Sequence, residues 1–401
     1  MFLHSIMTQK LYPELDISDR VLLSTGPTNV HSRVLKALST PVIGYSEPEF
    51  FPVVDGIAGM LGELFQSYGA LNMALPTTGS GGIEAGIASL VERGDTVVIG
   101  SYGFFCDRMI EIAKRQGANV HVVEGEWGKS LNPQAIKEEL KKHKSVKLVG
   151  LVQAETSTGI AQPLDEISKL VKDHDALLMV DAVTSLGGSE VGFDTIGMDY
   201  CFSASQKCLG CPPGLAPVAI SEVAMQVIKN RKQPPQTWYL DLSLIAEYWS
   251  AARTYHHTIP ASMFYALYEG LRVILEEGLD NRFKRHRGIA SALCDGLEAM
   301  GLQIISDPKS RLPQITPVWA PDGVDERRVR QRLVDEYGIE ISRGLGKFSG
   351  KAWRVGLMGE ACRPQNVISL LSALETILPS EGYEAPIGAG IAAAQESLDR
   401  V

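Results

Sequence analysis

Lys207 stands in a part of the sequence that solvates a charged amine poorly. It follows the strand-like run "DYCFSAS" and lies within "SASQKCLGCPPG", residues 203–214, whereas most other lysines occur in charged runs such as "KEELKKHKSVK". A poorly solvated ammonium has a lowered pKa and becomes a nucleophilic amine, which suits Schiff-base chemistry. The alternative is a lysine that simply extends its side chain to solvent.

A glycine-rich turn before a helical pattern offers a site for an anion. The segment "LPTTGSGGIEAGIASLVERG", residues 75–94, places Thr78, Gly79 and Ser80 directly ahead of the pattern. Free backbone N–H groups at a helix N-terminus bind phosphate. The segment has no Lys-Ser/Thr pair of a P-loop, and Glu84 occupies the place of the last glycine in a dinucleotide fingerprint. A turn that only opens the helix is an equally good interpretation.

A carboxylate follows each of two buried strand patterns. Asp181 ends the apolar run "ALLMVD", and Glu155 ends the preceding one. A carboxylate buried in this way needs a cationic or hydrogen-bonding partner, although an Asp that caps the following turn is the alternative. A phosphate site, a strand-end carboxylate and an isolated lysine match the phosphate, ring nitrogen and aldehyde of pyridoxal phosphate.

The elements that must position these residues alternate between strand and helix patterns. Strands are predicted at 95–103, 118–124, 146–156 and 176–185, and helices at 106–117, 132–143 and 163–174. Runs such as "ALLMV" are apolar on both faces, which is typical of strands covered by helices on each side. Repeated βαβ units predict an α/β protein with a mostly parallel sheet, whose ligands gather at the carboxyl ends of the strands.

The pattern changes after about residue 260. Two long helical segments, 261–278 and 281–301, lead into short strands and helices that predict a smaller α+β domain. The 401 residues also exceed what one core usually holds. We expect an N-terminal arm at 1–20, a large domain at 21–276, a small C-terminal domain at 277–380 and a weakly specified tail at 381–401.

Composition excludes several classes of protein. The net charge of -9 leaves no basic face for nucleic acid. No apolar run reaches the length of a membrane-spanning helix, and "MFLHSIMTQK" lacks the features of a secretory signal, so we expect a cytoplasmic protein. The six cysteines are too scattered for a disulfide framework. Cys208 and Cys211 have no second ligand pair nearby, so no metal site is expected and both are interpreted as small apolar residues around Lys207.

The order of these motifs resembles the class V group of fold-type I pyridoxal-phosphate aminotransferases, particularly the alanine–glyoxylate and serine–glyoxylate enzymes. The matching segments are "STGPTNV", "TTGSGGIEA", "YGFFCDR", "ETSTGIAQPLD", "VDAVTSLGG", "SASQKCLGCPPG", "YHHTIP" and "AWRVGLMG". Stretches such as "EWG", "DLSLIAEYWS" and "RFKRHR" are similar to the ureidoglycine–glyoxylate aminotransferases, and the overall frame is similar to pyridoxamine–pyruvate aminotransferase. The resemblance implies a large domain with a mostly parallel sheet flanked by helices, and a smaller C-terminal α+β domain.

The resemblance also implies a role for each matched residue. Lys207 would form the Schiff base with pyridoxal 5'-phosphate, and Asp181 would pair with the pyridine nitrogen. Thr78, Gly79, Ser80 and Gln206 would hold the phosphate, Phe105 and Val183 would cover the two ring faces, and Thr156 would lie beside the ring hydroxyl. Tyr255 and Thr258 would reach the phosphate of a neighbouring subunit, which implies a homodimer with its sites at the interface. Arg354 would bind the substrate carboxylate, with Gly26 and Tyr45 beside the substrate.

Departures from the family pattern bear on the substrate. Near Tyr45 the glyoxylate enzymes often have His-Arg-Ser-Pro, whereas this chain has "GYSEPEF", residues 44–50. The ureidoglycine enzymes tend to have Asn where this chain has Tyr255, which argues against that sibling. The pyridoxamine enzyme has an acidic residue in place of the Thr-Gly-Ser phosphate segment and an extra arginine before the carboxylate-binding one. Here Ser80 is intact, and Arg343 stands at a slightly different spacing from Arg354.

Together these observations predict a homodimeric aminotransferase that moves an amino group from alanine or serine to a 2-oxo acid, glyoxylate, by a ping-pong mechanism. Ureidoglycine–glyoxylate and then pyridoxamine–pyruvate aminotransferase are the alternatives within the family. Two alternatives come from other classes. A pyridoxal-phosphate lyase such as a cysteine desulfurase needs a catalytic cysteine, which "SRGLGKFSGKAW" lacks, and a nucleotide-binding α/β oxidoreductase would use the glycines at 79–82. The sequence does not set the preferred amino donor, because one or two pocket residues change it.

Overall fold

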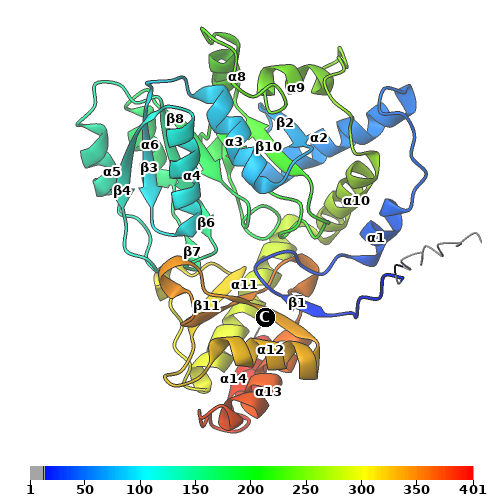
Figure 1. Cartoon of the computed structure of the whole chain (residues 1–401), viewed down its shortest axis with the longest axis vertical. Coiled ribbons are helices and arrows are strands. Elements are labelled where there is room, and N and C mark those ends of the chain that lie inside the picture. Colours follow the sequence, from blue (N-terminus) through cyan, green and yellow to red (C-terminus); the bar gives the residue numbers. More distant parts are fainter. Residues whose placement is uncertain (1–11, 13, 401) are drawn as a thin grey trace, which may run out of the picture.

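The computed structural model describes Tyr12 and residues 14–400. Its larger part (Figure 1) is built on a seven-stranded sheet. The strand order is β2-β10-β9-β8-β5-β3-β4. The strands are β2 (Leu71–Leu75), β3 (Thr96–Ser101), β4 (Asn119–Glu124), β5 (Leu148–Val152), β8 (Leu177–Asp181), β9 (Tyr200–Phe202) and β10 (Ala216–Ile220). β10 is antiparallel to both of its neighbours, and the other pairs are parallel. The prediction of a mostly parallel sheet is confirmed.

The helices predicted in this part at 106–117, 132–143, 163–174 and 261–278 form, together with several that the sequence analysis did not predict. They are α1 (Ser32–Leu38), α2 (Phe51–Phe65), α3 (Gly79–Leu90), α4 (Phe104–Arg115), α5 (Pro133–Leu140), α6 (Asp165–Lys172), α7 (Phe193–Ile196), α8 (Glu222–Lys229), α9 (Leu242–Trp249) and α10 (Ala261–Glu277). Local chemistry sets their ends: the Asn132 side chain accepts a hydrogen bond of 2.9 Å from the Gln134 amide at the start of α5. Gly117, with φ of +84°, follows the end of α4.

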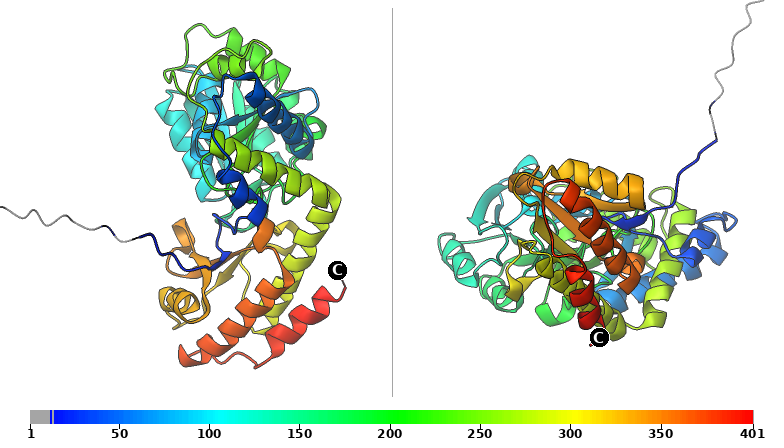
Figure 2. Two further views of the ribbon diagram at one scale, coloured as in Figure 1. Left: turned by 90° about the vertical axis from the view of Figure 1, so that its right-hand side faces the viewer. Right: turned by 90° about the horizontal axis from the view of Figure 1, so that it is seen from below.

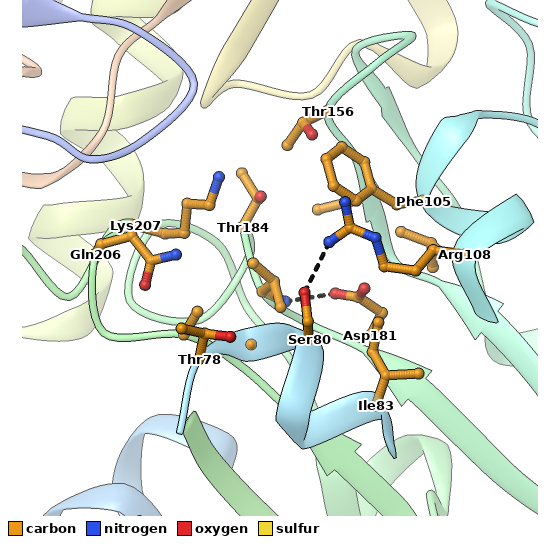
Figure 3. Close-up of a pocket in the computed structure, with 15 residues that line it drawn as sticks. Thr78, Ser80, Ile83, Phe105, Arg108, Thr156, Asp181, Thr184, Gln206 and Lys207 are labelled. Carbon is orange, nitrogen blue, oxygen red and sulfur yellow. Dashed lines mark hydrogen bonds between the residues drawn. The ribbon is translucent and has the colours of Figure 1, made fainter. Parts of the chain in front are cut away.

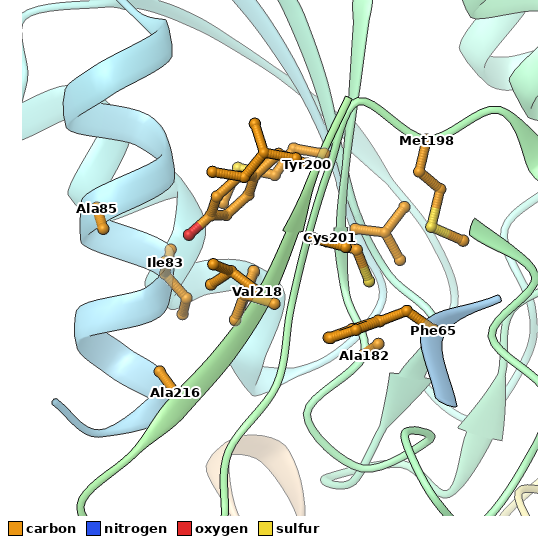
Figure 4. Packing of buried hydrophobic residues seen from close by; sticks show 14 of the residues in the cluster. Phe65, Ile83, Ala85, Ala182, Met198, Tyr200, Cys201, Ala216 and Val218 are labelled. Atoms are coloured by element: carbon orange, nitrogen blue, oxygen red, sulfur yellow. The ribbon is translucent and has the colours of Figure 1, made fainter. Parts of the chain in front are cut away.

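The two faces of the large sheet are covered by different helices, as the packing around β9 shows (Figure 4). Tyr200 points toward α3 and donates a hydrogen bond of 2.7 Å to the Gly82 carbonyl, whereas its neighbour Cys201 faces Phe65 of α2. Gly86 brings α3 close to the sheet, because a Cβ atom there would lie 2.3 Å from the Tyr200 ring. Strands buried on both sides explain the continuous apolar runs of the sequence.

A four-stranded sheet with the order β1-β12-β13-β11 forms the smaller part of the molecule. Its elements are β1 (Val21–Leu23), β11 (Ile315–Trp319), β12 (Ile339–Arg343), β13 (Ala352–Gly356), α11 (Leu279–Ala299), α12 (Glu326–Tyr337), α13 (Pro364–Ser380) and α14 (Ala389–Leu398). Short 3-10 turns are η2 (Pro308–Ser310), η3 (Gly346–Phe348) and η4 (Gly359–Ala361) here, and η1 (Pro48–Phe50) in the larger part. This sheet and its helices enclose a second hydrophobic core.

The structure differs from the expected domain limits at both ends. Val21–Leu23, expected in the large domain, pair in parallel with β12, and Leu23 is buried in the second core. Residues expected as a weakly specified tail form α14, which packs against α11 and α13 through Ala394 and its neighbours. Residues 1–11 and 13 of the expected arm lie outside the described residues, and 14–20 contain no helix or strand.

Helices α10 and α11 connect the two parts of the molecule (Figure 2). Gly278 separates the two helices and has a φ of +82°, a value that favours glycine. This break lies next to the predicted boundary at 276/277. The division into domains stays a prediction from the sequence.

All six cysteines are buried and carry free thiols. Cys208 and Cys211, the two cysteines of the C-x-x-C segment, are fully enclosed in the protein, as expected for small apolar residues. No helix among the described residues is both long enough and apolar enough to cross a membrane.

Candidate active site

One cavity at the carboxyl ends of the large-sheet strands collects most of the predicted site residues (Figure 3). Val152, Asp181 and Phe202 are paired in register, so β5, β8 and β9 end together. The predicted residues that line the cavity are Thr78, Gly79, Ser80, Phe105, Thr156, Asp181, Val183, Gln206 and Lys207. Residues separated by more than a hundred positions in the sequence therefore meet at the edge where an α/β sheet binds its ligands.

Lys207 reaches the cavity from the loop after β9. Its Nζ atom donates a hydrogen bond to the Thr25 carbonyl. Burial, with a smaller contribution from the charge of Arg354, lowers the pKa of Lys207 to about 8. A Cβ atom at Gly26 would lie 2.7 Å from the lysine side chain, and the φ of Gly26 is +101°. Glycine at position 26 thus leaves room for the amine, which is a nucleophile near neutral pH.

Asp181 lies opposite Lys207 at the end of β8. Its side chain is 3% exposed and accepts a hydrogen bond of 2.8 Å from the Val183 amide. Burial raises the pKa of Asp181 to about 7, because a carboxylate without a close cation is poorly stabilised there. A protonated nitrogen bound in the cavity would supply the missing partner.

The N-terminus of α3 forms another side of the cavity. Thr78 is the N-cap residue, and its side chain makes no capping hydrogen bond, so the first amides of the helix remain available to a ligand. Close packing requires glycine at position 81, because a Cβ atom there would lie 2.0 Å from the Thr77 hydroxyl. Gln206 Oε1 is buried and has no hydrogen-bond partner among the described residues. A phosphate ester fits the free amides of the helix, which donate hydrogen bonds, whereas Gln206 Oε1 can only accept one.

Phe105 is positioned by a carboxylate that sequence analysis noted only as a strand end. Glu155, fully buried, accepts hydrogen bonds from the Phe105 amide at 3.0 Å and from the Ser157 amide at 2.8 Å. Glu155 belongs to the short hairpin β6 (Ala154–Glu155) and β7 (Ile160–Ala161), which also carries Thr156. Burial raises the pKa of Glu155, and these hydrogen bonds oppose that rise. One side chain thereby holds both the start of α4 and the Thr156 loop.

Arg354 connects the smaller sheet to the same loop. It lies in β13, is 4% exposed, and donates hydrogen bonds to the Thr156 carbonyl at 3.2 Å and the Arg343 carbonyl at 2.8 Å. Burial lowers the pKa of Arg354 to about 10. The guanidinium remains a cation at neutral pH, so it can bind a carboxylate in two-pronged geometry.

The remaining predicted residues do not line the cavity. Tyr45 and Tyr255 stack on each other with ring centroids 5.9 Å apart, and Tyr255 is 59% exposed. Thr258 is exposed as well. Within the chain these three residues lie outside the cavity.

Arg108 and Thr184 also line the cavity, and sequence analysis missed both. Arg108 donates a hydrogen bond of 2.9 Å to the Ser80 hydroxyl and lies 5.1 Å from the centre of the Phe105 ring. Residues three positions apart on a helix share a face, so the spacing from Phe105 to Arg108 in "YGFFCDR" was the available signal.

A buried arginine of the smaller part supports the Lys207 loop from behind. Arg282 of α11 is 4% exposed and donates hydrogen bonds to the carbonyl oxygens of Cys208 at 2.7 Å and Gly187 at 2.6 Å. It also forms an ion pair of 2.6 Å with Glu277. The backbone beside Lys207 is thus fixed by a charged group from another helix.

Comparison with known proteins agrees with this geometry. Residues 77–355 match the family described as aminotransferase class-V. The structure of ureidoglycine-glyoxylate aminotransferase from Bacillus subtilis has a TM-score of 0.94 and 41% identity, over 96% of this chain and 100% of that chain. Alanine–glyoxylate aminotransferase from Nostoc sp. has a TM-score of 0.90 and 40% identity, over 94% and 100%. Pyridoxamine-pyruvate aminotransferase from Mesorhizobium loti has a TM-score of 0.91 and 30% identity, over 97% and 99%.

These likenesses span almost the full length of each chain, and all three relatives transfer amino groups, as their names state. They favour the aminotransferase interpretation over a lyase or an oxidoreductase. Enzymes of this family and fold depend in general on pyridoxal phosphate, and the three groups around the cavity fit its aldehyde, ring nitrogen and phosphate. The chain is an aminotransferase and belongs to the aminotransferase class-V family.

Proposed function

We propose that this chain binds pyridoxal phosphate and moves an amino group from alanine or serine to glyoxylate. The observation that carries the proposal is the convergence of an amine of lowered pKa, a buried carboxyl group and an uncapped helix N-terminus on one cavity. Each of the three groups matches one part of the cofactor. None of them is hydrogen-bonded to another of the three, so all remain available to a ligand.

In this proposal different residues of the cavity bind different parts of the cofactor. Thr78, Gly79, Ser80 and Gln206 hold the phosphate, Phe105 and Val183 contact the two ring faces, and Thr156 lies beside the ring hydroxyl. Asp181 keeps the proton on the ring nitrogen, since a raised carboxyl pKa marks a site that favours a cationic neighbour. Arg108 adds a positive charge next to Ser80 at the phosphate end.

Pyridoxal phosphate supplies an aldehyde that bonds to amines and a ring that accepts the electron pair left when a substrate Cα loses its proton. Lys207 acts as the base: its neutral Nζ removes the proton from Cα of the bound amino acid. Arg354 binds the carboxylate of the amino donor, and later that of the acceptor, so that both present Cα in the same place.

A homodimer forms part of the proposal. Tyr255 and Thr258 are exposed on one chain and would complete the phosphate site of the neighbouring subunit. Trp238, 63% exposed, contacts His256 beside this segment in a tilted ring arrangement, with ring centroids 4.2 Å apart. An exposed aromatic group of this kind is typical of a surface that a partner covers.

Glyoxylate is proposed as the acceptor because it appears in the names of two of the three relatives above. (S)-Ureidoglycine is the second candidate donor, favoured by the 41% identity with the Bacillus subtilis enzyme over almost the whole chain. Tyr255, where ureidoglycine enzymes tend to have Asn, favours the smaller donors. Pyridoxamine with pyruvate ranks third, because Ser80 and the phosphate segment are intact.

A half-reaction screen tests the proposal. The purified protein, loaded with pyridoxal phosphate, is mixed separately with alanine, serine, (S)-ureidoglycine and pyridoxamine, and the loss of absorbance of the lysine-bound cofactor is followed. We expect alanine or serine to react fastest and glyoxylate to restore the absorbance. Borohydride should fix the cofactor on the Lys207 peptide, and Lys207→Ala should bind the cofactor without turnover. Near-normal turnover in Lys207→Ala, or no reaction with any of the donors, would overturn the proposal.

A further inference from the structure

Two histidines and a glutamate meet on the far edge of the large sheet, away from the cavity. His121 lies in β4, an edge strand, while Glu139 lies near the end of α5 and His143 follows that helix. None of the three lines the cavity described above. Their side chains are partly buried, with exposed fractions of 39% for His121, 14% for Glu139 and 16% for His143.

The three side chains direct one atom each toward a common point. His143 Nε2 lies 3.0 Å from Glu139 Oε1, and His121 Nδ1 lies 3.7 Å from the same oxygen. One ligand atom from each residue lies within 4.8 Å of the other two. The imidazole rings are in contact, with centroids 4.0 Å apart.

Hydrogen bonding alone does not account for this arrangement. Glu139 Oε1 accepts a hydrogen bond from His143, but His121 is too far away to donate one and makes no other side-chain hydrogen bond among the described residues. Lys142 binds the other oxygen, Oε2, at 2.8 Å. The Glu139 carboxylate therefore directs Oε1 toward the two imidazole rings and Oε2 toward Lys142.

The ligand types and spacings suit zinc. Zn²⁺ binds imidazole nitrogen and carboxylate oxygen at about 2.0–2.2 Å, which places the ligand atoms of a tetrahedral ion about 3.4 Å apart. The distances of 3.0 and 3.7 Å bracket this value, and the half-exposed His121 leaves a position for water. The spacing of Glu139 and His143, four residues apart, is a common way to present two ligands on one side of a helix end.

We propose that His121, Glu139 and His143 form a zinc site that joins the edge strand β4 to the end of α5. The sequence predicted no metal site, because residue 121 is separated from 139 and 143 by a whole strand-to-helix connection and only folding brings the three together. The ion stabilises the outer edge of the sheet and takes no part in amino transfer. This site is independent of the proposed substrates.

Zinc binding to the tag-free, cofactor-loaded protein tests the proposal. The protein is stripped with a chelator, dialysed, and titrated with Zn²⁺ by calorimetry, and thermal unfolding is measured with and without the ion. We expect one ion per chain, a midpoint of unfolding raised by a few degrees, and unchanged aminotransferase activity. His121→Asn and His143→Gln should each weaken binding by at least about tenfold and remove the thermal shift.

Matched variants separate the site from surface charge. Glu138→Gln removes a neighbouring carboxylate of the same helix and should leave zinc binding unchanged, whereas Glu139→Gln should weaken it. Lys142→Gln removes the competing ammonium and should leave the affinity equal or higher. The proposal would be overturned if no zinc bound at 100-fold excess. It would also be overturned if both His121→Asn and His143→Gln left zinc binding intact, because the binding would then be adventitious only.

Discussion

The guanidinium of Arg282 donates a hydrogen bond of 2.7 Å to the carbonyl oxygen of Cys208, the residue directly after Lys207. A second hydrogen bond, to the Gly187 carbonyl, fixes the loop that follows Asp181. One buried side chain of α11 thus supports the backbone behind both residues proposed to act on the cofactor. The position of Lys207 depends on a contact between the two parts of the molecule.

Replacing Arg282 with lysine should slow catalysis more than it weakens substrate binding. Lysine keeps the positive charge for Glu277, but one nitrogen cannot serve two carbonyl oxygens in the geometry of a guanidinium. We expect kcat to fall about tenfold, which corresponds to about 1.4 kcal/mol, with the KM of the amino donor changed by less than about threefold. Steady-state kinetics checks this, with circular dichroism to confirm the fold.

Arg285→Lys is the matched control for Arg282. Arg285 also binds Glu277, and it donates to the Cys362 carbonyl at 2.6 Å rather than to the Lys207 loop. Equal losses of kcat in both variants would mean that Arg282 only stabilises the fold.

The lowered pKa of Lys207 should set the pH dependence of cofactor capture. Only the neutral amine attacks an aldehyde, so the rate at which cofactor-free protein binds pyridoxal phosphate should rise with pH and level off above about pH 8. Stopped-flow absorbance between pH 6 and 10 measures this. Because the Arg354 charge contributes to the lowered pKa of Lys207, Arg354→Met should move the midpoint to higher pH. A rate that climbs steadily to the ordinary lysine pKa of 10.5 would contradict the burial of the amine.

Asp181→Asn should stabilise the cofactor-free protein at alkaline pH while impairing the enzyme. The Asp181 pKa is about 7 in the folded protein and near 3.8 when unfolded, so the folded state binds the extra proton between these values. The stability that this carboxyl group contributes is therefore present at low pH and is lost as pH rises through 7. At pH 8 the wild-type protein buries a charge that asparagine does not carry.

Urea unfolding of the cofactor-free proteins at pH 5 and pH 8 tests the Asp181 prediction. The stability advantage of Asp181→Asn should increase between the two pH values, to as much as about 4 kcal/mol. Turnover should fall at least about 100-fold, because a neutral amide does not hold the proton on the ring nitrogen. An advantage that shrinks as pH rises would show that Asp181 is already paired with a cation.

Gly86→Ala should destabilise the large sheet, because its Cβ atom would lie 2.3 Å from the Tyr200 ring, inside the contact between α3 and β9. Overpacking of this kind costs about 1–3 kcal/mol. Gly59→Ala is the control: it lies on an exposed face of α2, and an added Cβ meets nothing within 4 Å. That variant should gain about 0.5–1 kcal/mol, since alanine favours the helix. Urea unfolding of the two variants should move in opposite directions.

The sequence predicts the parts of this structure that local patterns determine. The apolar runs of β3, β5 and β8, the glycines in the first turn of α3 and the isolated Lys207 each stand out within a short window, and chain order alone places them on one sheet edge. Contacts between segments that are distant in the chain have no recognisable pattern in the sequence, so they could not be predicted from it. Arg108 beside Ser80, Arg282 behind Lys207 and the pairing of Val21–Leu23 with β12 depend on how the elements pack in three dimensions.

The enclosed thiols give this protein a built-in set of reporters. A modifying reagent can reach a buried cysteine only when the surrounding structure opens, so the labelling rate of each thiol measures the opening of its own neighbourhood. Cys208 and Cys211 lie in the loop that carries Lys207, Cys106 and Cys201 in the large core, and Cys294 and Cys362 in the smaller part. Pulsed alkylation read by mass spectrometry can therefore follow, without any engineered probe, which region loosens when a ligand leaves.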